Sequence, residues 1–100
     1  MPQWSFLTNH ARVLLCIAND PGVRLREIAV ALGITERAAY SIVTDLVRAG
    51  YVHKDKQGRR NRYQIDGALP LRGSVARERT IGQVLEVLLD RGPDGQPAVP

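Results

Sequence analysis

Polar side chains recur on one side of the segment 36–49, where they could bind a polyanion. At 100° per residue, four of them share this side: Arg37, Ser41, Thr44 and Arg48. Four apolar residues share the opposite side: Ala39, Ile42, Val43 and Leu46. Guanidinium and hydroxyl groups on one helix face can donate to base edges and phosphate oxygens. The spacing therefore predicts a helix with a hydrogen-bonding outer surface, and Tyr40 lies at its edge.

Basic residues also gather just beyond this segment, around Gly58. Three arginines stand close together there: Arg59, Arg60 and Arg62. Residues 34–65 hold seven basic and three acidic residues, which accounts for the whole net charge of +4. A localised positive field favours a polyanionic partner because each neutralised phosphate releases counterions. A solvated basic loop is the alternative interpretation.

Other chemistries find little support in these residues. The sequence shows no glycine-rich phosphate loop, no nucleophile with its base and no paired-carboxylate motif. We therefore expect that the protein is not an enzyme. Cys16 is the only cysteine, and with His10 and His53 it leaves too few ligands for zinc. We therefore expect no metal and no cofactor. We interpret Cys16 as a small apolar residue rather than a redox switch, because no second cysteine could resolve it.

Length and hydropathy predict one small domain. The chain has 100 residues, 44% of them hydrophobic, and no apolar stretch approaches the ~18 residues of a membrane span. Residues 1–8 lack the basic and apolar regions of a signal peptide, so we expect a cytoplasmic protein without a membrane partner. We assign residues 1–90 to the domain and residues 91–100, rich in proline and glycine, to a flexible tail.

Capping residues and hydrophobic periodicity predict the helices and strands that position these side chains. Helices are predicted over 10–18 (capped by Thr8 or Asn9), 26–32 (ended by Gly33), 36–49 (capped by Thr35) and 74–90. In the last of these, Thr80 and Gln83 have a reciprocal capping pattern, and Ile81, Val84, Leu85 and Leu88 form an apolar stripe at helical spacing. Two strands, 51–56 and 62–66, flank a glycine-containing loop at 57–61. The fold class is thus mainly α with a small β-hairpin.

The second and third of these helices form a helix-turn-helix around Gly33 and Ile34. The second helix of such a motif can enter the major groove, which is about 12 Å wide. The hairpin would place its basic loop beside that helix, within reach of phosphates.

The motifs of this region resemble those of a known family. Residues 25–35 read L-R-E-I-A-V-A-L-G-I-T, residues 46–52 read L-V-R-A-G-Y-V, and residues 58–63 read G-R-R-N-R-Y. This pattern resembles bacterial winged helix-turn-helix transcription regulators of the MarR and ArsR kind, over roughly residues 8–66. The three-helix core, the hairpin "wing" and a C-terminal helix would then make up the fold.

The resemblance implies a sequence-specific regulator that binds double-stranded DNA as a homodimer on a pseudo-palindromic operator. It implies six readout positions on the recognition helix: Thr35, Glu36, Arg37, Tyr40, Ser41 and Thr44. It implies phosphate contacts from the wing arginines Arg59, Arg60 and Arg62. Terminal segments would form the dimer interface, which here means Trp4, Phe6, Leu7, Ile81, Val84, Leu85 and Leu88.

Two other functions remain open. A winged helix can serve as a protein–protein interaction module in which the basic face is incidental. A ligand- or redox-sensing regulator could work through a cleft near Trp4, Phe6 and Cys16. The chain is shorter than family members with a ligand cleft and lacks the paired cysteines of metal-sensing members. We therefore expect an operator binder without a small-molecule effector, or one controlled by another protein.

Overall fold

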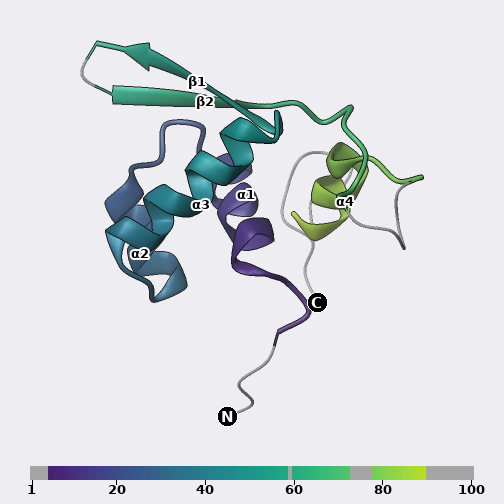
Figure 1. Ribbon diagram of the computed structural model, residues 1–100, viewed down its shortest axis with the longest axis horizontal. Helices are drawn as coiled ribbons and strands as arrows, with labels where there is room; N and C mark the ends of the chain where they lie inside the picture. Colours follow the sequence, from purple (N-terminus) through teal and green to yellow (C-terminus); the bar gives the residue numbers. More distant parts are fainter. Residues whose placement is uncertain (1–4, 59, 73–77, 90–100) are drawn as a thin grey trace.

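The computed structural model describes residues 5–58, 60–72 and 78–89. Its elements follow in this order: α1 (Asn9–Asn19), α2 (Leu25–Leu32), α3 (Glu36–Arg48), β1 (Val52–Gln57), β2 (Arg60–Ile65) and α4 (Ile81–Leu88). In Figure 1 the β1–β2 hairpin lies above the first three helices and reaches toward the side of α2, whereas α4 lies on the opposite side. This arrangement confirms the predicted mainly α-helical chain with one β-hairpin.

Threonine side chains begin α1, α3 and α4. Thr8, Thr35 and Thr80 have an extended backbone, and each Oγ1 accepts a hydrogen bond from the backbone N–H three residues later at 3.0 to 3.2 Å. The bond satisfies a donor that has no partner inside the first helical turn. The predicted caps Thr35 and Thr80 are confirmed, and Thr8 rather than Asn9 caps α1.

A tight turn joins α2 to α3. Gly33 has a φ of +70°, a left-handed conformation that glycine adopts without steric cost. The backbone N–H of Ile34 then donates to the Ala29 carbonyl at 3.0 Å, which closes the end of α2. Because the turn is short and hydrogen-bonded, it fixes the first turn of α3 relative to α2. The predicted helix-turn-helix is thereby confirmed.

The apolar core lies between the helices and the base of the hairpin. Val13, Ile17, Ile28 and Val52 are its largest fully buried side chains. The apolar side of α3 packs into the same cluster. Burial of each large aliphatic side chain stabilises the fold by roughly 1.5–3 kcal/mol. The core therefore holds the inner face of α3 and leaves its outer face to solvent.

The hairpin is longer and its turn tighter than the sequence predicts. The strands pair antiparallel from Val52 opposite Ile65 to Gln57 opposite Arg60. Only residues 58 and 59 separate the strands, so the predicted loop over 57–61 is wrong. Gly58, with a φ of +63°, allows the chain to reverse there. The polar residues taken for a loop belong to strands that extend beyond the core, where both faces can be polar.

One backbone bond anchors the hairpin to the helices. The N–H of Tyr63 donates to the Pro21 carbonyl, in the turn between α1 and α2, at 2.9 Å. Tyr63 itself is buried. The second strand is therefore attached directly to the turn that precedes α2.

The segment 67–72, which we name the strap, leads from the hairpin to α4. Ile81 donates its backbone N–H to the Leu69 carbonyl at 2.8 Å, and Gly82 donates to the Gly67 carbonyl at 3.0 Å. A third bond joins Leu71 to the Arg79 carbonyl at 2.9 Å. The strap thus runs antiparallel to the beginning of α4 and holds it in place.

The last helix is shorter than the predicted range 74–90. It begins at Ile81, because Thr80 has the extended backbone of a cap and residues 78–80 are not helical. Residues 74–77 and 90, like the predicted tail 91–100, lie outside the described residues. No helix in the described ranges is long and apolar enough to cross a membrane.

Candidate nucleic-acid interface

The outer side of α3 is accessible, as the sequence predicts. Five of the six predicted readout residues are exposed: Thr35, Glu36, Arg37, Tyr40 and Ser41. Thr44 is half-buried. Tyr40 keeps 56% of its surface exposed although it is a large aromatic residue. The hydrogen-bonding surface of the helix is therefore not consumed by packing within the chain.

Arg37, like Arg48 further along α3, has no hydrogen-bond or ion-pair partner within the described part of the chain. The two carboxylates of α3, Glu36 and Asp45, both lie against other residues. The Glu36 Oε1 lies 3.6 Å from the Nε of Arg26, and the Asp45 Oδ2 lies 2.8 Å from the Nε2 of His10. All of the Arg37 donors consequently remain available to a ligand.

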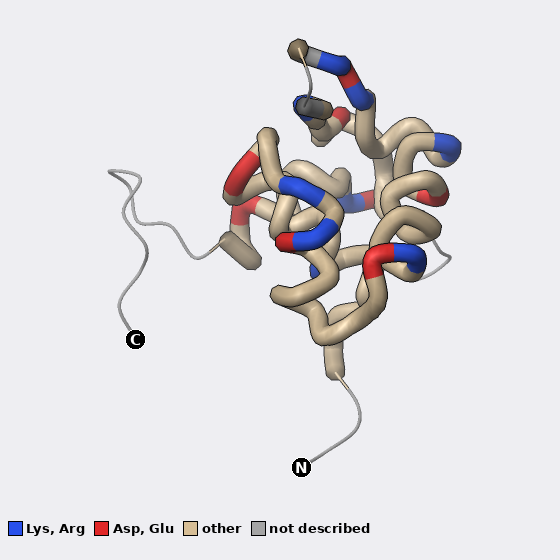
Figure 2. The backbone as a smooth tube through the Cα atoms, turned by 90° about the vertical axis from the view of Figure 1, so that its left-hand side faces the viewer, with Lys and Arg blue, Asp and Glu red and all other residues tan. Residues whose placement is uncertain are grey.

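The hairpin carries a second group of cations. Arg62 is exposed and stands opposite Asp55 in the strand register. Lys54 and Lys56, on β1, are also exposed. Figure 2 shows Lys and Arg positions gathered on the hairpin at the top of the view, with further basic positions on the helices below.

The other two predicted wing arginines are described only in part. Arg60 is the first residue of β2 and stands opposite Gln57, so it lies in a strand rather than in a loop. Arg59 lies outside the described residues. Of the three predicted wing arginines, Arg62 is thus the one whose side chain the structure describes as exposed.

The hairpin and the helix-turn-helix meet at a polar hollow of about 430 Å³. The hollow is lined by the beginning of α2, by Glu36 of α3, and by Asn61 and Tyr63 of β2. Three separate elements therefore share one surface, and the hairpin does not extend away from α3.

Arg24 and Arg26, which are not among the predicted contact residues, also line this hollow. Both side chains are exposed at the beginning of α2. The first helix of a helix-turn-helix crosses the DNA backbone. Two arginines at the start of the predicted helix 26–32 were the signal that could have identified them.

The predicted dimer residues lie in different environments. Ile81 and Leu85 are buried in the core of the chain itself, where α4 packs against α1. Val84 and Leu88 are half-buried, and Val87, beside them, is 78% exposed. The solvent-facing part of the stripe is thus formed by Val84, Val87 and Leu88, which line an apolar depression together with Arg79 and Gln83.

The N-terminal part of the predicted interface is described from residue 5 onward. Phe6 is 91% exposed and Leu7 is half-buried. Trp4 lies outside the described residues. The aromatic surface of Phe6 is therefore accessible next to the start of α1.

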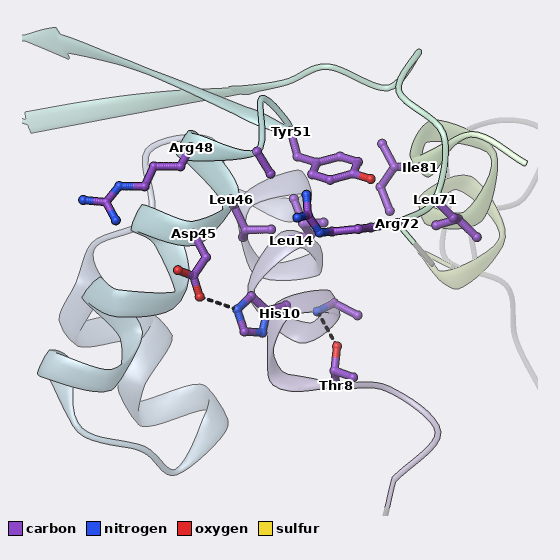
Figure 3. Close-up of a pocket in the computed structure, with 12 residues that line it drawn as sticks. Thr8, His10, Leu14, Asp45, Leu46, Arg48, Tyr51, Leu71, Arg72 and Ile81 are labelled. Carbon is purple, nitrogen blue, oxygen red and sulfur yellow. Dashed lines mark hydrogen bonds and ion pairs between the residues drawn. The ribbon is translucent and has the colours of Figure 1, made fainter. Parts of the chain in front are cut away.

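A cavity of about 540 Å³, which the sequence did not reveal, opens between α1, α3 and the strap. Leu14, Leu46 and Ile81 contribute apolar walls, and His10, Asp45 and Arg72 contribute polar groups. Figure 3 shows the His10–Asp45 bond at this cavity, with Arg48 extending away from it. This volume falls in the range of small-molecule sites, ~300–1,000 Å³.

Burial raises the pKa of two groups, one on α1 and one on β2. Burial raises the pKa of the Cys16 thiol above its ordinary value, and the charge of Arg12 opposes this shift. Cys16 is half-buried and packs against the core. The thiolate is the reactive form of cysteine, so a raised pKa keeps this thiol protonated and unreactive near neutral pH. Burial likewise raises the pKa of the Tyr63 phenol, against a hydrogen bond from Asn61.

Within the described ranges, no three or more His, Cys, Asp or Glu side chains form a group that could hold a metal ion. The hydrogen bond between His10 and Asp45 links α1 to α3.

Three helices, a tight turn between the second and third, and a β-hairpin beside the third define a winged helix-turn-helix domain. A sequence comparison identifies the family: the model of the MarR family matches residues 5–61, more than half of the chain. The chain therefore belongs to the MarR family, whose members are winged-helix transcription regulators rather than enzymes. A comparison with curated proteins finds no match.

Proposed function

We propose that this regulator binds double-stranded DNA sequence-specifically and acts as a homodimer on a pseudo-palindromic operator. The observation that carries the proposal is the exposed outer side of α3, on which Arg37 has no partner among the described residues. Asn61 and Tyr63 of the hairpin line the polar hollow shared with the helix-turn-helix, whereas Arg62 lines a second hollow beside the turn between α1 and α2.

The outer side of α3 would supply sequence choice. A helix with its side chains fits the major groove, and arginine pairs bidentately with the O6 and N7 of guanine. We assign this contact to Arg37. Thr35, Ser41 and Thr44 carry hydroxyls suited to bases or phosphates, and Tyr40 offers a ring edge and a hydroxyl to the sugar–phosphate backbone.

The hairpin would supply affinity. Arg62 and its neighbours Arg59 and Arg60 are the proposed phosphate contacts, supported by Lys54 and Lys56. Each phosphate neutralised by a cation adds about one unit to the slope of log affinity against log salt concentration. These contacts carry no base information, so their loss would weaken all sequences alike.

Apolar surface on α4 supports the proposed dimer. Val84, Val87 and Leu88 form an apolar strip on a helix whose other face already contributes to the core. A two-fold interface buries the same patch on both subunits. A second α4 is therefore the partner that we assign to this strip, with Phe6 and Leu7 as additional contacts.

A salt titration with a point-mutant series tests the proposal. Wild-type protein should lose affinity for labelled duplex linearly in log salt, with a slope of several. Arg37→Ala should relax selectivity at one position of each half-site by about 1–3 kcal/mol, while Arg62→Ala should lower the slope by about one on every duplex. Arg72→Ala removes the same charge from the strap, which is not part of the outer side of α3 or of the hairpin, and serves as the control.

Selection of bound duplexes from a random pool tests the symmetry. An enriched inverted repeat is the expected outcome. Salt-independent binding, or equal losses on cognate and random duplex from both variants, would refute the assigned roles and favour a protein-interaction module.

A further inference from the structure

The two carboxylates of α3 have different surroundings. Asp45 binds His10 at 2.8 Å on the side of α1. Glu36, the first residue of the helix, lies against α2, where its Oε1 is 3.6 Å from the Nε of Arg26. A second acid near this position, Glu27, is already occupied because it accepts the Arg24 backbone N–H at 2.8 Å. Glu36 is thus the acid at this corner whose oxygens are not committed to a cap.

A carboxylate at the start of the recognition helix lowers the affinity for DNA. Phosphates repel a carboxylate, so an uncompensated Glu36 would weaken binding to every duplex. The pair with Arg26 does little for folding, because both side chains are exposed, 83% for Arg26 and 61% for Glu36. Glu36 lies in the first turn of α3, where its charge favours the helix dipole, but neither that effect nor non-specific affinity requires Arg26 beside it.

We propose that Glu36 selects cytosine at one base pair of each half-site and that Arg26 is the positioning residue that holds its carboxylate. This inference rests on the proposed function. The N-terminal residues of a recognition helix contact base edges, and glutamate accepts a hydrogen bond from the exocyclic N4 amino group of cytosine. Adenine also has an amino group in the major groove, but its adjacent N7 acceptor, which cytosine lacks, repels a carboxylate. Glu36 would therefore favour cytosine over the other three bases.

Arg26 is placed to perform two tasks at once. Its Nε faces Glu36, which leaves both terminal nitrogens of the guanidinium without a partner among the described residues. These nitrogens lie at the first turn of α2, the part of the motif that crosses the DNA backbone. A phosphate contact there offsets the charge of Glu36 locally and keeps the carboxylate beside the groove. Arg24 and Glu27 are the other charged groups lining the hollow, and the Glu27 carboxylate stays bound to its cap.

Glu36→Gln provides the sharpest test, because it removes the charge and keeps the shape. Duplexes would be selected from a random pool with wild-type and variant protein, and dissociation constants measured on the selected sites. We expect wild-type protein to enrich cytosine at one position of each half-site. Because glutamine pairs with the N6 and N7 of adenine, the variant should prefer adenine there, with a preference ratio changed by about ten- to a hundredfold. Glu86→Gln, an exposed acid on α4, is the matched control and should change no position.

Arg26 variants test the positioning role. Arg26→Met should lower discrimination at the Glu36 position, leave the Arg37 position unchanged and reduce the salt slope by about one. Arg26→Lys keeps the charge and should restore the slope, but its single ammonium cannot face the carboxylate and the phosphate together, so selectivity should stay low. Circular dichroism melts of all variants establish that each one folds.

The outcomes separate this inference from the proposed function. If Glu36→Gln raises affinity for all duplexes equally and shifts no base preference, Glu36 acts only through its charge and the inference is overturned. If wild-type protein shows no salt-dependent, sequence-selective binding, the proposed function fails and this inference fails with it.

Discussion

Gly82→Ala tests whether the close approach of α4 to the strap constrains the fold. A Cβ at Gly82 would lie 2.8 Å from the carbonyl oxygen of Gly67, 3.1 Å from its Cα and 3.3 Å from its carbonyl carbon. All three are backbone atoms, so no flexible side chain can move aside. The same oxygen accepts the Gly82 N–H at 3.0 Å, so moving it away would break that bond.

The expected magnitude is a difference of two opposing effects. Overpacking against backbone costs about 1–3 kcal/mol. Alanine in place of glycine recovers at most about 1 kcal/mol of helix propensity, and less in the first turn of α4. We therefore expect Gly82→Ala to lower the free energy of unfolding by about 1–2 kcal/mol. For a chain of this size the Tm falls by about 4–8 °C per kcal/mol.

Thermal and urea unfolding followed by circular dichroism measure this change. Glu86→Ala, an exposed position on the same helix, is the control and should stay within about 0.5 kcal/mol of wild type. A Tm raised by Gly82→Ala would show that propensity dominates and that the contact between the strap and α4 does not constrain the chain.

Three further predictions concern stability and assembly. Thr35→Ala removes the cap of α3 and should cost about 0.5–2 kcal/mol in urea unfolding, whereas Thr35→Ser should cost much less; equal losses would argue against the cap. Burial raises the pKa of both Cys16 and Tyr63, so the unfolded chain loses these protons at lower pH than the folded chain does. The stability that both groups contribute is complete below their ordinary pKa values of 9.0 and 10.0, and it falls as the pH rises beyond them. Cys16→Ala should therefore make the decline in the urea midpoint between about pH 8 and pH 10.5 shallower. An unchanged decline would show that the buried Cys16 thiol does not contribute to it. Val87→Glu places a charge in the strip on α4 and should shift the proposed dimer to monomer in light scattering without lowering the monomer's helix content; an unchanged mass would place the interface elsewhere.

Local chemistry explains why the helix boundaries could be predicted. The caps Thr35 and Thr80 and the left-handed Gly33 act through bonds within a few residues of themselves. Such signals are contained in short stretches of sequence, and so the helix-turn-helix was recognisable before any packing was known.

Packing over longer distances was not predictable in the same way. The two carboxylates of α3 have partners on other helices: Asp45 bonds to His10, 35 residues away, and Glu36 lies against Arg26. The stripe on the last helix was recognised, but only the arrangement of α1 and α4 decides that Ile81 faces inward and Val87 outward. These features depend on how helices are placed against one another, which periodicity alone does not specify.

The strap has a consequence for operator architecture. Since three backbone hydrogen bonds join it to the start of α4, the root of the wing and the proposed partner-binding helix cannot drift independently. A dimer joined through α4 would therefore hold its two recognition helices at a fixed distance from each other. Inserting a few base pairs between the two half-sites of the inverted repeat should then prevent both subunits from binding at the same time. A dimer with flexibly linked DNA-binding domains would tolerate the insertion.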